Sequence, residues 1–215
     1  DSVFYRTEEL ERKTKNDAAL SGYHSGTQFS SLMNLNVSHF YQDVGMEGGK
    51  NFYCAGGATP LLSVMLSIRY VLADNAMEEG PLRTLVAQSG DTYLYENAYV
   101  LPLGFMMDED VAEKWDYAGG GDIGTQNQLA NLLGSDRLLL TAVESESKAG
   151  ESSFVAQDSA YYYATYSKTG VDNLQEQVSS GRTRGFTKVS HGYILDLGYC
   201  EAGEEVKVTN TANEL

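Results

Sequence analysis

The chain has no long apolar run and few cysteines. Its longest apolar stretch, residues 60–73, is shorter than a membrane-spanning helix requires, and Arg69 interrupts it. Two cysteines among 215 residues exclude a disulfide framework. A single bridge between Cys54 and Cys200 stays open, because sequence spacing does not fix disulfide geometry. We therefore predict that no part of this chain crosses a membrane by itself.

Basic residues are also scarce. The chain has 15 Lys and Arg against 30 Asp and Glu, which gives a formal net charge of −15. A charge of this sign repels phosphate backbones and excludes a nucleic-acid partner. Apolar residues make up 42% of the chain, which is typical of a folded domain. The chain begins at Asp1 with neither Met nor a secretory signal, so we expect a piece of a longer protein.

The usual catalytic signatures are missing. There is no GxSxG, HExxH or CxxC motif, and no spacing supports a zinc site built from Cys54, Cys200 and two histidines. Residues 119–124 satisfy GxGxxG, but residues 113–118 before them do not form a strand, so a turn is favoured over a nucleotide site. The carboxylates at 108–110 are more typical of a solvated helix start than of a glycosidase pair. We expect no catalytic residue, no metal and no cofactor in this chain.

For residues 1–137 the sequence pattern predicts a mixed α/β subdomain. Apolar patterns indicate strands at residues 3–8, 68–73, 84–88, 92–96 and 100–107. Helical spacing and capping residues indicate helices at residues 36–44, 60–66, 110–115 and 126–133. Ser89, Gly90 and Asp91 predict a hairpin turn, and Gly134 is expected to close the last helix. The nearly all-apolar helix at 60–66 is expected to be buried.

For residues 138–215 the sequence pattern predicts a β-sandwich-like or jelly-roll-like subdomain. Short strands with glycine turns between several of them are indicated at residues 154–155, 161–166, 186–189, 193–197 and 206–208. Residues 171–178 are interpreted as a helix or a loop. The two parts together predict an α+β fold.

Aromatic and polar residues within strands offer candidate contacts for a ligand. Tyr161 and Tyr163 should share one face of a strand and Tyr162 the other. An exposed tyrosine face suits sugar rings, although tyrosines that only cover the sheet are the simpler interpretation. Polar groups also interrupt apolar strands, and leaving them buried without partners would be costly. Internal pairing is favoured over ligand binding for Arg6, Arg69, Glu96 and Asn97.

Several sequence blocks resemble one known family. They are FYRTE from Phe4, the segment from KNDAALSG to FYQDVGM, GGATPLLSVMLSIRYVLAD, and YENAYVLPLGFMM up to Met107. The later blocks TQNQLANLLG and DLGYCEAGEEVKV continue the resemblance over nearly the whole chain. In order and spacing these blocks resemble the bacterial YfhO membrane-protein family. YENAYVLPLGF is the most specific of them.

This resemblance implies a setting for the chain. Members of the family are large polytopic proteins similar to GT-C glycosyltransferases, which use polyprenyl-phosphate sugars, and they are implicated in lipoteichoic acid glycosylation in Gram-positive bacteria. The resemblance implies an extracytoplasmic, non-catalytic region at the bacterial cell membrane, with the transmembrane portion of the same polypeptide as its partner. The catalytic acid of such enzymes lies on an early loop outside this chain. The alternative is a stand-alone carbohydrate-binding or adhesive surface module.

A cell-wall glycopolymer is the ligand that the resemblance implies, and teichoic acids are polyanions. A chain of net charge −15 would need a local basic patch with aromatic residues to hold such a polymer. Basic residues that could form this patch are Arg12, Lys13 and Lys15 near the start of the chain and a group near its end. The group near the end is favoured, and its predicted ligand-binding residues are Arg182, Arg184, Phe186, Lys188, His191 and Tyr193. A solvated basic turn is the alternative interpretation of this cluster.

Overall fold

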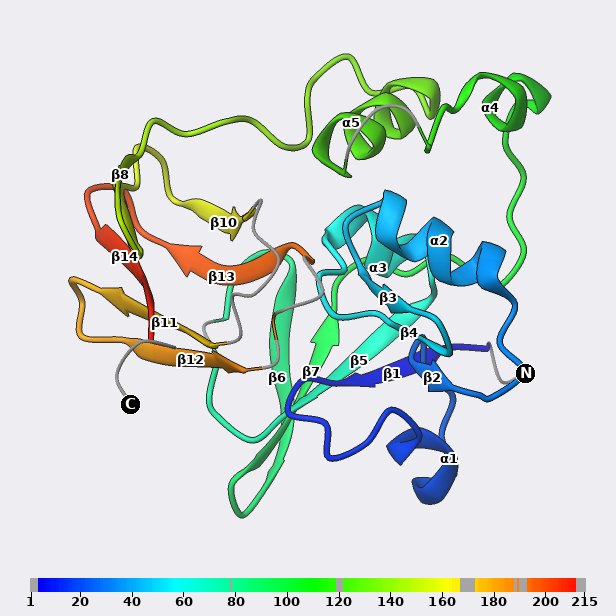
Figure 1. Ribbon diagram of the computed structural model, residues 1–215, viewed down its shortest axis with the longest axis horizontal. Coiled ribbons are helices and arrows are strands. Elements are labelled where there is room, and N and C mark those ends of the chain that lie inside the picture. The colour runs from blue at the N-terminus through cyan, green and yellow to red at the C-terminus, as the bar shows by residue number, and fades with distance from the viewer. Residues whose placement is uncertain are drawn as a thin grey trace. The chain divides into compact units, whose positions relative to one another are not determined.

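A computed structural model describes residues 4–77, 79–118, 122–166, 173–187, 189 and 193–211 (Figure 1). The chain divides into two compact units, Asp1–Leu140 (unit 1) and Thr141–Leu215 (unit 2). The sequence prediction places this boundary between residues 137 and 138. Unit 1 combines sheets with helices and unit 2 is built of strands, which confirms the predicted α+β class.

Unit 1 contains two sheets. The larger has the strand order β1-β5-β7-β6, with β1 parallel to β5 and the other neighbours antiparallel. Its strands are β1 (Arg6–Glu9), β5 (Ile68–Ala73), β6 (Arg83–Ser89) and β7 (Thr92–Asn97). The smaller sheet consists of β2 (Gln28–Phe29), β3 (Glu47–Gly49) and β4 (Phe52–Cys54), with β4 in the middle.

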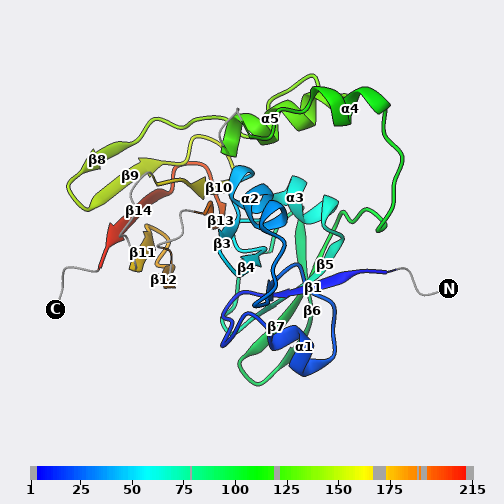
Figure 2. The same cartoon turned by 45° about the vertical axis from the view of Figure 1, so that its right-hand side comes forward.

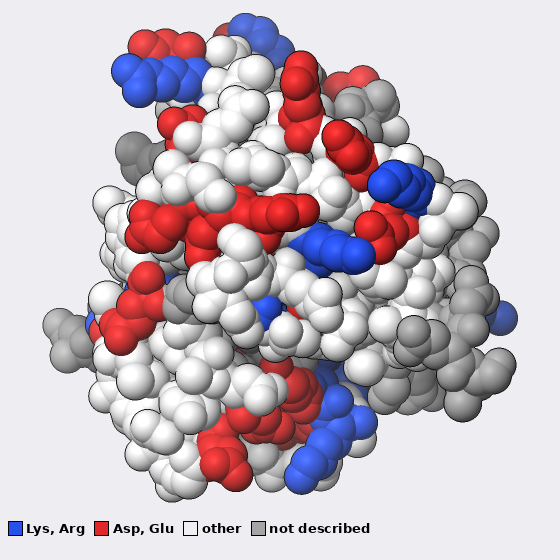
Figure 3. Space-filling view, turned by 90° about the vertical axis from the view of Figure 1, so that its left-hand side faces the viewer, with Lys and Arg blue, Asp and Glu red and all other residues white. Residues whose placement is uncertain are grey.

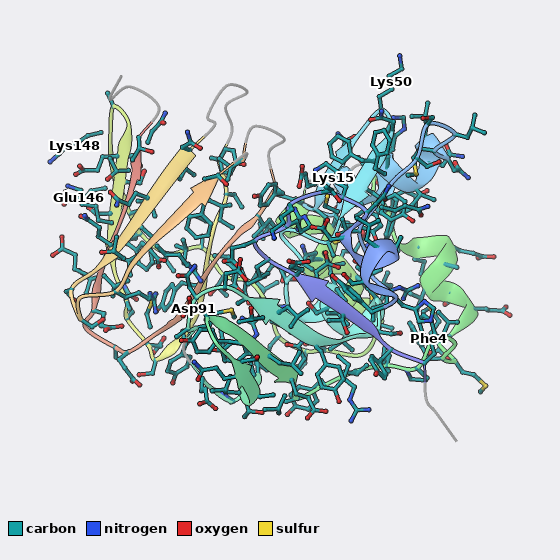
Figure 4. The ribbon with its side chains drawn as sticks, turned by 90° about the horizontal axis from the view of Figure 1, so that it is seen from below. Phe4, Lys15, Lys50, Asp91, Glu146 and Lys148 are labelled. Carbon is teal, nitrogen blue, oxygen red and sulfur yellow. The ribbon has the colours of Figure 1, made fainter. Side chains whose placement is uncertain are left out.

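The hairpin between β6 and β7 forms as predicted. Gly90 adopts a positive φ of 57°, a conformation that glycine reaches without the steric penalty of a Cβ atom. Figure 4 shows Asp91 at the tip of this hairpin. The residues Ser89 and Thr92 face each other as the last pair of the ladder.

Five helices accompany these sheets among the described residues of unit 1. They are α1 (Asp17–Ser21), α2 (Leu35–Asp43), α3 (Pro60–Met65), α4 (Glu109–Lys114) and α5 (Asp122–Leu132). Asn34 caps α2 by accepting a 3.0 Å hydrogen bond from the Asn36 amide. Gly134 follows α5 with a φ of 97°, as the sequence predicts. Within α3 only Leu62 is fully buried, so the apolar helix is less covered than expected.

The core of unit 1 has two adjoining parts. One gathers between α2 and α3 and contains Tyr41, Val44, Met46 and Leu62. The other lies against the larger sheet and contains Ala55, Ile68, Val71, Ala73 and Tyr95. Val71 and Tyr95 are direct neighbours across β5 and β7, so they bury the same face of the sheet.

The strand predicted at residues 100–107 is absent, because these described residues form neither helix nor strand. Pro102 lacks the amide proton that a ladder needs, and Gly104 weakens a strand interior. The segment instead becomes the long connection from β7 to α4, drawn in green in Figures 1 and 2.

Unit 2 is made of two sheets that share one core. The larger has the order β12-β11-β14-β9-β8, and the smaller pairs β10 with β13. Side chains from both sheets meet in the core, which includes Tyr162, Leu174, Leu197 and Val206. The strands are β8 (Glu146–Lys148), β9 (Glu151–Val155), β10 (Ala160–Ala164), β11 (Asn173–Val178), β12 (Thr183–Thr187), β13 (Leu195–Cys200) and β14 (Glu205–Asn210).

The interpretation of residues 171–178 as a helix or loop is wrong for the described part, because Asn173–Val178 is strand β11. Leu174, Glu176 and Val178 are buried at every second position, which is the period of a strand. The middle one of these buried residues is the charged Glu176. A pattern search that looks only for apolar residues therefore misses the alternation.

Both cysteines are free thiols, so the bridge left open by the sequence does not form. Within the described parts of the chain, no helix is long and apolar enough to span a membrane.

Candidate functional site

Two tyrosines and an ion pair form a solvent-accessible group on the larger sheet of unit 1, here called the tyrosine platform (Tyr5, Arg69, Tyr70 and Glu96). Tyr5 directly precedes β1, next to Phe4, which Figure 4 labels. Its ring packs edge-on against the Tyr70 ring of β5, with centroids 5.2 Å apart and an interplanar angle of 84°. The parallel pairing of β1 with β5 brings these two rings together.

The ion pair completes the platform. Arg69 Nε donates a 2.8 Å hydrogen bond to Glu96 Oε1, and the two side chains are 42% and 33% exposed. Glu96 lies directly opposite Tyr70 across β5 and β7, so both leave the same face of the sheet. The Arg69 guanidinium lies 5.5 Å from the Tyr70 ring centroid and 6.0 Å from that of Tyr5. The hydrogen bond to Glu96 raises the pKa of Arg69, which stays a cation.

The predicted internal pairing of the strand polar groups is confirmed. Arg6 Nη1 donates to the Leu66 carbonyl at 2.6 Å, and Asn97 Nδ2 donates to the Ile68 carbonyl at 2.9 Å. The sequence interpretation treated internal pairing and ligand contact as alternatives. Arg69 and Glu96 combine a direct pair with solvent access, so their remaining hydrogen-bonding capacity faces outward.

A second polar group, the Glu47 cluster (Arg12, Lys15, Glu47 and Cys54), surrounds a buried carboxylate in unit 1, and its two cations are partly exposed. Glu47 Oε1 accepts from Lys15 Nζ at 2.7 Å, and Oε2 accepts from Arg12 Nη2 at 3.2 Å. Lys15, labelled in Figure 4, also lies 3.3 Å from Cys54 Sγ and 4.0 Å from the Phe52 ring centroid. Burial raises the pKa of the Cys54 thiol to about 11, so this thiol is protonated at neutral pH.

Glu8 lies beside this cluster and is itself buried. Its Oε2 accepts from Ser25 Oγ at 2.8 Å and from the Gly26 amide at 3.2 Å, while Thr27 donates a short bond to Oε1. Arg12 Nη1 lies 3.9 Å from Oε1. Burial outweighs these favourable contacts and raises the pKa of the Glu8 carboxyl above its ordinary value.

A small pocket opens over Glu8 and the cations of the Glu47 cluster. It contains about 180 Å³ of empty space. Much of this space is open to solvent and the enclosed part is about the size of one water molecule, so the pocket suits water or a single polar group. Its lining is almost entirely polar and consists of Glu8, Glu9, Arg12, Thr14, Lys15, Asp17, Ala18, Tyr23, Ser25 and Thr27.

Two arginines of the basic cluster predicted from sequence bind a buried carboxylate in unit 2, and we call this group the Glu176 cluster (Glu176, Arg182, Arg184 and Cys200). Arg182 Nη2 bonds Glu176 Oε1 at 2.9 Å, and Arg184 Nε lies 3.3 Å from Oε2. The Glu176 side chain is 0% exposed. Arg182 also donates to the carbonyls of Leu197 and Tyr199, at 2.7 and 2.9 Å.

The other predicted ligand residues are partly accounted for. The Arg184 guanidinium lies 4.9 Å from the Phe186 ring centroid, and both Phe186 and Tyr193 pack against the unit 2 core. Lys188 and His191 lie outside the described residues. Arg182 and Arg184 thus neutralise Glu176, and their binding of an external ligand stays a prediction.

The tyrosines of β10 alternate in burial as the sequence predicts, because Tyr162 is buried and Tyr161 and Tyr163 are half-buried. Tyr162 enters the core, and its hydroxyl donates to the Asp158 carbonyl at 2.8 Å. The pairing register with β13 shifts between Tyr162 and Tyr163, because β13 has the extra residue Leu197 at this point. Tyr161 packs edge-on with Tyr199, with centroids 5.3 Å apart.

The carboxylates at 108–110 and the GxGxxG match do not contribute to a site among the described residues. Asp110 pairs with Lys114 within α4, where the sequence places a solvated helix start. Gly119 and Gly121 of the GxGxxG match lie outside the described residues. Within the described ranges, no group of three or more His, Cys, Asp and Glu side chains could hold a metal ion.

A model of the bacterial membrane protein YfhO matches residues 1–201 of the chain. The chain belongs to the YfhO family. The match confirms the resemblance seen in the sequence blocks and covers the tyrosine platform and both buried clusters. No curated protein and no solved structure matches the chain.

Three of the blocks that carry the YfhO resemblance meet at the platform. Tyr5 comes from FYRTE, Arg69 and Tyr70 from the block that ends in IRYVLAD, and Glu96 from YENAYVLPLGFMM. The strand order β1-β5-β7 places these blocks side by side. Local sequence patterns do not predict that these four residues lie together, because their proximity depends on the pairing of strands that are distant in sequence.

Proposed function

We propose that this YfhO-family chain is an extracytoplasmic, non-catalytic part of a membrane glycosyltransferase-like protein and holds the glycan acceptor on the tyrosine platform. The observation that carries the proposal is the half-exposed pair of Tyr5 and Tyr70 beside the ion pair of Arg69 and Glu96. The resemblance implies lipoteichoic acid as the acceptor and the outer face of the bacterial membrane as the location.

The chemistry of the platform suits a sugar. Pyranose rings present C–H faces that pack on tyrosine rings and hydroxyl rims that need donors and acceptors. Arg69 supplies donors and Glu96 supplies acceptors beside the rings. Because the charges of the pair cancel, the platform favours an uncharged sugar unit over a phosphate.

The overall charge supports the same preference. The net charge of −15 opposes a polyanionic backbone at long range, although salt screens this beyond about 8–10 Å. Among the described residues drawn in Figure 3, acidic side chains form the more extensive patches and basic ones lie scattered between them. The sugar substituents of an acceptor polymer therefore fit this chain better than its phosphates. A stand-alone carbohydrate-binding module would use the same platform, but the YfhO match favours the membrane protein.

The test is a titration of the isotope-labelled chain with neutral oligosaccharides, followed by backbone amide shifts. We expect saturable shifts around Tyr5, Tyr70 and Glu96 at millimolar ligand. Tyr5→Ala should weaken binding about fivefold to tenfold, because one stacking surface is lost. Tyr199→Ala is the matched control, since Tyr199 and Tyr161 form an edge-on pair of similar geometry in unit 2.

Two outcomes would overturn the platform as the site. One is the absence of shifts at tens of millimolar ligand. The other is a set of shifts confined to unit 2, around Arg182 and Tyr193, which would favour the ligand cluster predicted from sequence.

A further inference from the structure

We propose that residues 99–107 form a lipid-contacting loop that docks this chain on the surface of a phospholipid bilayer. The loop reads YVLPLGFMM and contains no charged residue. Three of its side chains are strongly exposed: Tyr99 by 63%, Leu103 by 61% and Met106 by 98%. The proposal rests on the family match and on this loop, and it is independent of glycan binding.

The loop is held at the surface of unit 1 and does not fold into its core. The Ala98 amide bonds the Leu82 carbonyl at 3.0 Å, and the Leu101 amide bonds the Val64 carbonyl at 3.2 Å. Leu101 and Phe105 are half-buried, whereas Leu103 and Met106 point away. The half-buried side chains attach the loop to unit 1, and the exposed ones face solvent.

The exposed apolar side chains of this short loop indicate that another molecule or phase covers them. Single exposed apolar residues are ordinary on soluble proteins, but a contiguous apolar stretch usually marks an interaction site. Since the YfhO family is a family of membrane proteins, a bilayer is the apolar phase available to this chain.

The loop backbone sets the depth of docking. An irregular backbone carries amide groups that hydrocarbon cannot satisfy, so the loop fits the headgroup–acyl boundary and cannot cross the membrane. Tyr99 suits that boundary, because its ring is apolar and its hydroxyl can stay hydrated. Asp108, Glu109 and Asp110 follow directly and would stop insertion at Met107.

Charge predicts the lipid preference. The acidic residues after the loop and the net charge of −15 repel anionic headgroups. Docking driven by apolar contact should be strongest on zwitterionic vesicles. On anionic vesicles it should be weaker at low salt and should recover as salt screens the repulsion.

Docking would also position the tyrosine platform. Glu96 stands three residues before Tyr99 along the chain, where β7 ends and the loop begins. A loop fixed on the bilayer would hold the platform close to the membrane surface, where a lipid-anchored acceptor emerges.

The test is co-sedimentation of the 215-residue chain with phosphatidylcholine vesicles, and with vesicles in which half of the lipid is phosphatidylglycerol. Leu103→Ser combined with Met106→Ser should lower partitioning at least tenfold. The control pair is Leu20→Ser with Leu32→Ser, which removes two leucines that are 81% and 94% exposed outside the loop. The control should bind within twofold of the unaltered chain. All four side chains are exposed, so thermal unfolding should show that both variants stay folded.

A second measurement reports depth. Met106→Cys can be labelled with an environment-sensitive fluorophore, because Cys54 and Cys200 are both buried. We expect a blue shift of the probe on phosphatidylcholine vesicles and no shift for the same probe introduced by Leu20→Cys.

Three results on vesicles would overturn the proposal. The first is an equal loss of binding in the control pair, and the second is a probe at position 106 that stays in water. The third is binding that is stronger on anionic vesicles and is lost when salt is added.

A fourth result would identify a second copy of the chain as the partner. This result is self-association that the loop variant abolishes, together with no binding to vesicles.

Discussion

The Glu47 cluster of unit 1 and the Glu176 cluster of unit 2 use the same chemical groups in different surroundings. In each, a buried carboxylate binds two cations, and one cation lies 3.3 Å from a buried cysteine sulfur. Glu176 and Arg184 are direct neighbours across β11 and β12, whereas Arg12 and Lys15 come from the connection between β1 and α1. A sheet therefore fixes one cluster, and a loop beside a pocket supplies the cations of the other.

This difference has an energetic consequence. Arg182 and Arg184 also donate to carbonyls of β13, so their positions are fixed by the sheet as well as by the carboxylate. Arg12 and Lys15 line the pocket and can reach water if their carboxylate partner is lost. The cluster with fewer ways to relax should be the more costly to disrupt.

The largest effect is expected for Glu176→Gln. Two half-buried guanidinium groups would lose their buried counter-charge, and the free energy of unfolding should fall by about 3–5 kcal/mol. Urea unfolding followed by circular dichroism measures this. Glu151→Gln is the control, because its 2.6 Å pair with Lys207 is partly exposed and should contribute about 1 kcal/mol or less. Equal losses in the two variants would remove the special role of burial.

A smaller loss is expected for Glu47→Gln, about 2 kcal/mol. The neutral amide can still accept one hydrogen bond, and Lys15 can turn toward the pocket water. The same urea measurement applies. A loss of stability as large as that of Glu176→Gln would show that water in the pocket does not compensate Arg12 and Lys15 for the lost carboxylate charge.

Glu8→Gln should reveal a pH dependence that belongs to the pocket. Burial raises the pKa of Glu8, so the folded state binds its proton more tightly than the unfolded state does. The stability this group contributes is present below the unfolded pKa of 4.5 and is lost as pH rises through the folded value. The stability difference between the unaltered chain and Glu8→Gln should therefore decrease from pH 4 to pH 7. A flat or opposite trend would contradict this assignment.

The smallest effect on stability is expected for Arg69→Ala. Its pair with Glu96 is solvent-accessible, so unfolding should be unchanged within experimental error. The same variant should weaken oligosaccharide binding in the amide-shift titration, since it removes the donors beside the tyrosine rings. A large loss of stability would identify the pair as structural and remove it from the platform's binding chemistry.

Local sequence patterns predicted much of unit 1. The strand at Ile68–Ala73 begins and ends where the sequence places it, and so does the turn at Gly90. These features depend on neighbours along the chain, where periodicity and glycine conformation are sufficient. The failure at residues 171–178 comes from Glu176, whose role depends on distant partners, whereas Pro102 and Gly104 within residues 100–107 are local signals against a strand. In β11 the inward position of Glu176 is acceptable only because two arginines reach it.

The amino-acid sequence alone is enough to recognise the acidic charge, the α+β class, the YfhO resemblance and the need to pair Arg6 and Arg69. Only the tertiary structure decided which partners they have, because Arg6 bonds a carbonyl 60 residues away and Arg69 an acid 27 residues away. It also brought Tyr5 beside Tyr70 and left Tyr99, Leu103 and Met106 exposed. Burial periodicity is encoded between near neighbours, whereas these contacts depend on strand order, which is settled when the sheets assemble.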